Sequence, residues 1–181
     1  TWNSLDKQQN TNGSYGAQTT FSEGNLRATG SSASAGYTWA KSTIGGKTGK
    51  WYAEMKLVSG QDLSWGFGIA EDTFKGGIYG SLVDAYSGNG KSYINDVDAA
   101  LGDGVACVIG DVMGIAVDFE TKTTWHSVNG AWQVFTDPTN AGSGWTRPLL
   151  SGKTIHIAFS DGRGGSPAPV VDVNFGQGDP D

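Results

Sequence analysis

The sequence predicts an all-β sandwich or barrel, and three observations lead to that fold class. Glycine makes up 29 of the 181 residues without a Gly-X-Y period, and these glycines separate short apolar runs, where turns and bulges need them. Several runs alternate apolar and polar residues, which is the period of a strand with one buried face. No segment of useful length has a helical period. The length suits a single domain spanning residues 1–181.

Four strands are expected in the first half of the chain. Residues 1–24 are polar apart from a few large side chains and are interpreted as an edge segment followed by a loop. Strands follow at residues 25–29, 37–44, 49–57 and 65–70. The third alternates most regularly, because Trp51 and Met55 share one face with Ala53 and Leu57. The fourth has one face of Gly and Ala, which lets a neighbouring layer approach closely.

The clearest pattern of the second half is a β-meander at residues 110–132. An alternating strand ends in a polar turn at 120–122, and a second strand leads to Asn129-Gly130. Asn-Gly is a strong hairpin signal, because both central residues of a type I′ turn need positive φ. Around the meander we expect short strands at 85–87 and 92–94, a loop at 132–149, and two further strands centred on Ile157 and Val173.

Composition excludes several classes of function. The formal net charge is −6, and no Lys/Arg cluster is longer than a dipeptide, which disfavours binding to a nucleic-acid backbone. No apolar run reaches the length of a membrane span, so no membrane insertion is expected. Cys107 is the single cysteine and cannot form an intrachain disulfide. Its apolar neighbours predict a small buried side chain rather than a catalytic thiol.

A search for catalytic residues favours a protein that is not an enzyme. A sandwich glycosidase needs two carboxylates that face one cleft at a fixed separation. Asp118 and Glu120 are the only candidate pair, and a solvated strand end is the better interpretation of them. A glycan-active enzyme that uses Glu120 is therefore the weakest alternative, and no catalytic residue is predicted.

No cofactor or resident metal is predicted either. Asp96 and Asp98 suggest calcium, but an EF-hand loop that begins at Asp96 would have Ala100 and Leu101 where a ligand and a glycine belong. This leaves open an irregular calcium site near Asp96 and Asp98. His126 and His156 are interpreted as outward or cross-strand residues rather than zinc ligands. Phosphate-loop and dinucleotide motifs are absent from the sequence.

Binding through loops remains, and a small set of residues is predicted to contact a ligand or partner. Aromatic and Arg side chains are typical of interface anchors and of platforms that stack sugars. The candidates are Trp132, Trp145, Arg147, Tyr79, Tyr86 and Arg163. Two alternatives remain for them: Trp145 could simply close one end of the sandwich, and some of the tyrosines must belong to the core.

Four motifs in order resemble the SPRY (B30.2-like) domain family. They are Gly49-Lys50-Trp51-Tyr52-Ala53-Glu54, Trp65-Gly66-Phe67-Gly68-Ile69, the run Gly110-Asp111-Val112 to Asp118-Phe119 with Asn129-Gly130, and Asn174-Phe175-Gly176-Gln177. They place a SPRY-like core at 45–177 after an N-terminal extension with edge strands at 1–44. The sequence departs from the family at His126-Ser127-Val128, where relatives often have Phe-Tyr-Lys. The resemblance implies a concanavalin-like, jelly-roll sandwich of two antiparallel sheets and a binding module.

The N-terminal residues narrow the resemblance further. Three short segments are similar to SPRY-like modules of bacteriophage structural and tail-associated proteins: Thr1-Trp2-Asn3, Leu5-Asp6-Lys7 and Gly24-Asn25-Leu26. This implies a virion protein (capsid decoration, head fibre or tail) whose partners are other virion proteins or a host-surface receptor or glycan, with a homo-oligomer as one form. The alternative is a cytoplasmic SPRY adaptor that binds a short peptide through its loops.

Overall fold

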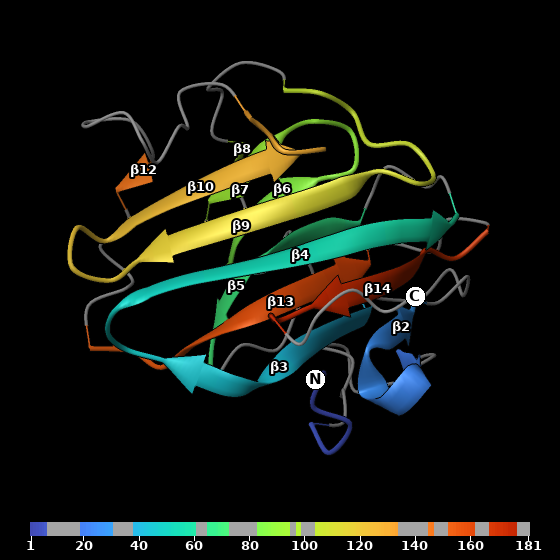
Figure 1. Ribbon diagram of the computed structural model, residues 1–181, viewed down its shortest axis with the longest axis horizontal. Helices are drawn as coiled ribbons and strands as arrows, with labels where there is room; N and C mark the ends of the chain where they lie inside the picture. Colours follow the sequence, from blue (N-terminus) through green and yellow to red (C-terminus); the bar gives the residue numbers. More distant parts are fainter. Residues whose placement is uncertain are drawn as a thin grey trace.

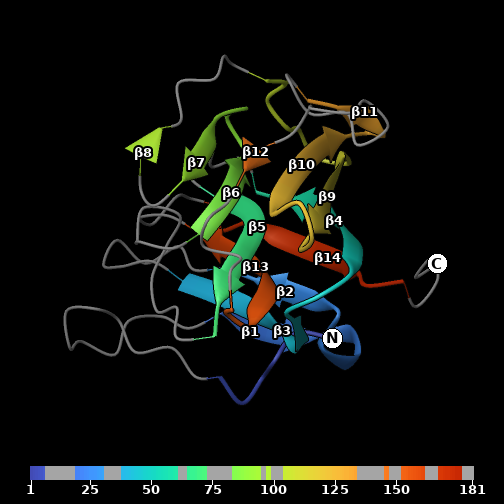
Figure 2. The same cartoon turned by 90° about the vertical axis from the view of Figure 1, so that its left-hand side faces the viewer.

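Two antiparallel β-sheets pack face to face and form a sandwich (Figures 1 and 2). The computed structural model describes residues 1–6, 19–30, 38–60, 65–72, 83–94, 97–98, 104–133, 145–146, 152–161 and 167–176. Within these residues one 3-10 turn, η1 (Glu23–Asn25), is the only helical element. The predicted all-β sandwich is therefore confirmed, and the alternative of a closed barrel is not what the chain forms.

The larger sheet has eight strands among the described residues and crosses the front of Figure 1. Its order is β1-β2-β14-β4-β9-β10-β11, and β12 also pairs with β10. Their bounds are β1 Thr20–Ser22, β2 Arg27–Thr29, β4 Lys50–Ser59, β9 Val112–Asp118, β10 Thr123–Val128, β11 Ala131–Trp132, β12 Trp145–Thr146 and β14 Val170–Asn174.

The smaller sheet has six strands among the described residues and forms the second layer seen from the side in Figure 2. Its order is β3-β13-β5-β6-β7-β8. The bounds are β3 Thr38–Gly46, β5 Gly66–Glu71, β6 Val83–Ser87, β7 Ser92–Ile94, β8 Val97–Asp98 and β13 Ile155–Asp161. The chain passes from this sheet to the larger one between β3 and β4, where Gly49 has a φ of 81°.

The core lies between the sheets and is built from alternate residues of their strands. Met55 and Ile115 from the larger sheet are completely buried, as are Phe67 and Phe159 from the smaller one. Their burial follows from the pleat, since every second side chain of a strand points to the same face. Trp51, Ala53, Met55 and Leu57 share the inner face of β4 as predicted.

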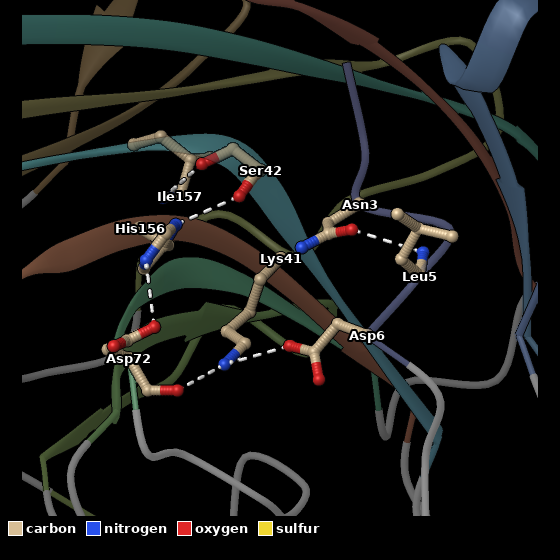
Figure 3. A network of polar contacts seen from close by, with 8 residues as sticks. All are labelled: Asn3, Leu5, Asp6, Lys41, Ser42, Asp72, His156 and Ile157. Atoms are coloured by element: carbon tan, nitrogen blue, oxygen red, sulfur yellow. Dashed lines mark hydrogen bonds and ion pairs between the residues drawn. The ribbon is translucent and has the colours of Figure 1, made fainter.

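The outer face of the smaller sheet is also buried. Trp39, Ala70, Ala85 and Ala158 form a second apolar cluster there. Beside it, Lys41 is only 5% exposed, and its Nζ atom lies 2.9 Å from Asp6 Oδ2 (Figure 3). The same ammonium group donates a hydrogen bond of 2.6 Å to the carbonyl oxygen of Asp72. The N-terminal residues therefore pack on this sheet.

His156 belongs to the same outer network. Its Nδ1 atom lies 2.8 Å from the carbonyl oxygen of Ser42, and its Nε2 atom lies 3.5 Å from Asp72 Oδ1 (Figure 3). His156 faces outward from β13 as the sequence predicts, because its neighbours Ile155 and Ile157 point into the core.

His126 corrects the prediction for the other histidine. It pairs with Ile115 in the register of β9 and β10, so its side chain points between the sheets and is 1% exposed. There its ring stacks on Tyr86 with 5.7 Å between the ring centroids. Asp84 on β6 accepts a hydrogen bond from Thr124 and lies 3.6 Å from His126 Nε2. This polar group connects the two sheets.

Most of the remaining strand predictions agree with the structure to within a few residues. The loop predicted at 132–149 is wrong in part, because Trp145–Thr146 forms β12 and pairs with β10, and the short strand β8 was not predicted. The strand expected at 25–29 begins only at Arg27, because Gly24 and Asn25 adopt positive φ values of 62° and 65° in η1. The Asn129-Gly130 hairpin is confirmed, since these residues have φ values of 50° and 76° and join β10 to β11.

Candidate binding surface

Of the six residues that the sequence proposed as a binding site, the structure describes Tyr86, Trp132 and the backbone of Trp145, and these lie on three different strands. Trp132 lies on β11 and is partly exposed. Trp145 belongs to β12, whose backbone pairs with β10. Tyr79, Arg147 and Arg163 lie outside the described residues, so their roles stay predictions.

Tyr86 requires a correction. Its side chain is 1% exposed within the main core, where it stacks on His126. Its hydroxyl group donates a hydrogen bond of 2.8 Å to the carbonyl oxygen of Val105. A ring in this position cannot contact a partner directly, and the structure instead assigns Tyr86 a supporting role beneath a neighbouring segment.

That segment, residues 104–110, is named here the apolar loop. It displays three branched aliphatic side chains to solvent: Val105 is 57% exposed, Val108 53% and Ile109 50%. Cys107 points the other way and is 3% exposed, as the sequence predicted. Burial, with a smaller contribution from Asp111, raises the pKa of its thiol to about 12. The loop therefore presents an apolar surface, and Cys107 attaches it to the core.

The first half of the apolar loop is tied to both sheets by hydrogen bonds. Gly104 N–H donates to the carbonyl oxygen of Gly90 over 2.8 Å, and Cys107 N–H donates to that of Gly88 over 2.9 Å. Both acceptors lie in the turn between β6 and β7 of the smaller sheet. From the larger sheet, the residue after β11 contributes, because Gln133 Oε1 accepts a bond of 2.9 Å from Val105 N–H.

The second half is tied to the β10–β11 hairpin. Asp111 Oδ2 accepts a hydrogen bond of 2.8 Å from Val108 N–H, and its Oδ1 atom accepts one of 2.8 Å from the Asn129 side-chain amide. Gly110 N–H donates to the carbonyl oxygen of Leu57 on β4 over 2.8 Å. The loop thus crosses one end of the sandwich with its backbone fixed at both ends.

A fixed loop with branched side chains is suited to binding another protein. Val and Ile have few rotamers, so they lose little entropy when a partner covers them. A backbone that is already ordered also avoids the cost of ordering on association. Burying such side chains contributes about 25 cal/mol for each Å² of apolar surface removed from water.

Sequence reasoning did not find this surface. A continuous apolar run can equally be a buried segment, so the run at 105–109 predicts the burial of Cys107 but not the exposure of its neighbours. The one signal in the sequence is that glycines, Gly104 and Gly110, bound the run on both sides, and Gly110 adopts a φ of 98°. Glycine at both ends is typical of a loop rather than a strand.

Asp118, one of the two acidic residues that formed the best catalytic candidate, caps the turn that contains the other, Glu120. Asp118 Oδ1 accepts hydrogen bonds from the backbone N–H groups of Glu120 (2.8 Å) and Thr121 (3.3 Å), and its Oδ2 atom lies 3.3 Å from Lys50 Nζ. Burial raises the pKa of Asp118, but these bonds and Lys50 together outweigh it and hold the pKa below the usual 3.8. These contacts account for Asp118 as a residue that stabilises the turn, and no catalytic role is needed to explain its position.

Neither a metal-binding cluster of His, Cys, Asp and Glu nor a helix able to cross a membrane occurs in the described part of the chain. Asp96, where the sequence left an irregular ion site open, lies outside that part.

Comparison with known proteins supports the fold. No protein-family model and no curated protein sequence matches this chain. Among solved structures, it is similar to the SPRY domain of human HERC1, with a TM-score of 0.70 and 14% sequence identity over 89% of this chain and 94% of that one. The sandwich is therefore SPRY-like in architecture, as the four sequence motifs implied.

Proposed function

We propose that this chain is a non-catalytic interaction module that binds a partner protein through the apolar loop. The observation that carries the proposal is the half exposure of Val105, Val108 and Ile109 on a backbone bonded to both sheets. The SPRY-like architecture supports it, since the resemblance implies a binding module rather than a catalyst. The net charge of −6 favours a protein partner over a polyanion.

Two pairs of substitutions test the proposal. Val108→Ser with Ile109→Ser makes the apolar loop polar, whereas Leu5→Ser with Ile44→Ser changes two other exposed apolar side chains, which are 87% and 69% exposed. Proteins that the immobilised wild-type chain retains would be identified, and the amount that each variant retains would be compared. Calorimetry would then measure the affinity of each partner for the wild-type chain and for both variants. We expect the loop variant to bind at least about tenfold more weakly, which corresponds to 1.4 kcal/mol, and the control to bind normally.

Two outcomes would overturn this function. One is that no protein is retained specifically by the wild-type chain. The other is that the loop variant binds the recovered partner as tightly as the control does. Circular dichroism and urea unfolding of both variants would show whether either result reflects a change in folding.

The finer proposal is that the partner belongs to a phage-like particle and that the chain is a virion component. Its support is the resemblance of the N-terminal residues, including Thr1-Trp2-Asn3 and Gly24-Asn25-Leu26, to phage modules. Immunoblotting and mass spectrometry of purified particles would detect the chain if this is correct. A glycan array and a cell-binding assay would then distinguish a receptor or glycan ligand from a second virion protein.

The alternative, a cytoplasmic adaptor that binds a short peptide, keeps the same loop as its contact surface. A peptide array would separate the two, because an adaptor binds a linear segment of its partner and loses that binding on Val108→Ser. Binding only to intact particles would exclude the adaptor.

A further inference from the structure

A second surface lies on the outer face of the larger sheet, next to the apolar loop. It consists of Tyr52 and Glu54 on β4 and Trp132 on β11, and is named here the aromatic corner. Glu54 pairs with Gly114 on β9, Gly114 with Ser127 on β10, and Ser127 with Trp132. Paired residues share a face, so this register places Glu54 and Trp132 on one row across four strands.

Tyr52 forms the floor of the corner. A Cβ atom added at Gly114 would lie 2.7 Å from Tyr52 Oη and 3.2 Å from its Cε2, so the tyrosine ring lies against the strand where the glycine leaves room for it. The side chain nevertheless remains 50% exposed. Its hydroxyl group donates a hydrogen bond of 2.7 Å to Glu54 Oε1, which fixes the orientation of the ring.

Trp132 forms the wall. Its ring meets that of Tyr52 at an interplanar angle of 69°, with 6.3 Å between the centroids. Trp132 and Glu54 are each partly exposed. Two aromatic rings in edge-to-face contact and a carboxylate therefore lie side by side on this face, and each is at least partly open to solvent.

Two basic side chains of β4, Lys50 and Lys56, lie on the same face as Glu54. Lys50 flanks the corner on β4 and pairs with Asp118 over 3.3 Å. Lys56 lies opposite Asp172 in the register of β4 and β14, and Asp172 binds Arg27 through two hydrogen bonds of 2.6 and 2.7 Å. Within the described residues no ion pair involves Glu54, so its negative charge is available to a ligand.

We propose that the aromatic corner binds a cationic side chain, Arg or Lys, of a partner protein. Aromatic faces attract cations, Trp most strongly, and a guanidinium group can stack on Tyr52 while it donates hydrogen bonds to Glu54. The net charge of −6 also favours a basic partner. The site does not depend on the partner of the apolar loop, although Trp132 directly precedes Gln133, which holds that loop.

Small probes test this site without knowledge of the partner. N-acetyl-arginine amide would be titrated into the ¹⁵N-labelled protein and the indole N–H resonance of Trp132 followed by NMR. N-acetyl-citrulline amide is the neutral probe of the same shape, and methyl glucoside tests the sugar alternative. We expect a saturable shift with the arginine probe, at least about fivefold weaker binding of the citrulline probe, and weaker binding at high salt.

Three variants locate the interaction. Glu54→Gln removes the charge but retains an oxygen that can accept the Tyr52 hydrogen bond, and Tyr52→Leu removes the floor. Each should weaken arginine binding by at least about fivefold. Glu120→Gln removes the same charge at an exposed turn position and should leave binding unchanged.

Three outcomes would each overturn the proposal. The arginine and citrulline probes could give equal shifts, or the wild-type and Glu54→Gln proteins could bind the arginine probe equally. The third is a Trp132 shift with the glucoside alone. The apolar-loop variant should still bind the arginine probe. Failure of the corner and failure of the proposed function are thus separate results.

Discussion

The two sheets bury similar inner faces but differ on their outer faces. On β4 of the larger sheet, the outward side chains alternate with the core, and Tyr52 is 50% exposed. On the smaller sheet, the outward residues Trp39, Ala70 and Ala158 are at most 3% exposed. The outer face of β4 is therefore open to solvent, whereas Trp125 and Asp118 farther across the same sheet are buried, as is the part of the smaller sheet around Trp39. Both proposed binding surfaces are consistent with this division.

The largest effect should come from glycines that face outward on each sheet. At Gly68 an added Cβ atom would overlap the backbone oxygen of Asp84 and lie 2.6 Å from Ala85 Cα. Because β6 cannot retreat without losing its pairing with β5, Gly68→Ala should lower the free energy of unfolding by about 3 kcal/mol. At Gly114 an added Cβ atom meets only side-chain atoms of Ser127 and Tyr52, which can give way by a small shift without breaking strand pairing, so Gly114→Ala should cost about 1 kcal/mol. Urea unfolding of both variants measures the difference, and equal losses would contradict the comparison.

A pair of lysine substitutions compares the outer faces directly. Lys41→Met on the smaller sheet removes the contacts of the ammonium group with Asp6 and the Asp72 carbonyl. We expect a loss of about 2 kcal/mol, less than for a fully buried pair because Asp6 is 27% exposed and can be hydrated. Lys56→Met on the exposed face of β4 should change stability by less than about 0.5 kcal/mol. Thermal and urea unfolding provide the test, and similar losses for both would show that the two faces are not different.

The pH dependence of stability should report on Asp118, which lies on the outer face of the larger sheet. Its pKa is lowered in the folded protein from the usual 3.8. A lowered pKa means that the stabilisation is present above the unfolded value and is lost as the pH falls through the folded one. Asp118→Asn, which retains an oxygen for the turn, should reduce the loss of stability below pH 3.8. Urea midpoints measured across this range would detect it, and identical acid profiles would contradict it.

The smallest effect concerns ionisation of Tyr52. Burial of the hydroxyl group, followed by its hydrogen bond to Glu54, raises the pKa of Tyr52 to about 12. The stabilisation from protonated Tyr52 is thus present below the ordinary pKa of 10.0 and is lost as the pH rises through about 12. Glu54→Gln should lower this pKa, because the negative charge that opposes ionisation is removed. Subtracting the tyrosinate absorbance of Tyr52→Phe from that of the full set of tyrosines isolates the titration of Tyr52. The same Tyr52 titration in wild-type and Glu54→Gln proteins would contradict the interaction between Tyr52 and Glu54.

Much of the scaffold could be predicted because its signals are local. Alternation placed the inner face of β4, and Asn129-Gly130 placed a hairpin, since a type I′ turn needs positive φ at both positions. The inward position of His126 was missed because alternation in β10 permits either face to be the buried one. Pairing with β9, which sets His126 beside Ile115, decides between them.

The candidate surfaces were predicted less well, because exposure depends on contacts between distant residues. Trp132 was proposed from sequence as a contact residue and lies in the aromatic corner, but its neighbours Tyr52 and Glu54 come from a strand about eighty residues earlier. The apolar loop was missed for the same reason. The N–H group of Val105 donates a hydrogen bond to Gln133, and its carbonyl oxygen accepts one from Tyr86. These bonds hold Val105 at the surface, and no pattern within residues 104–110 specifies them.

The sequence by itself therefore determined most of the strands, the main turn and the SPRY-like order of motifs, all of which rest on backbone preferences and on the two-residue period. Only the tertiary structure decided which outer face is covered and which apolar residues remain exposed. A strand pattern defines two faces, but what packs against the second face is set by residues far away in the chain. For that reason Trp39 and Ala158 are buried, while Tyr52 and Val108 remain exposed to solvent.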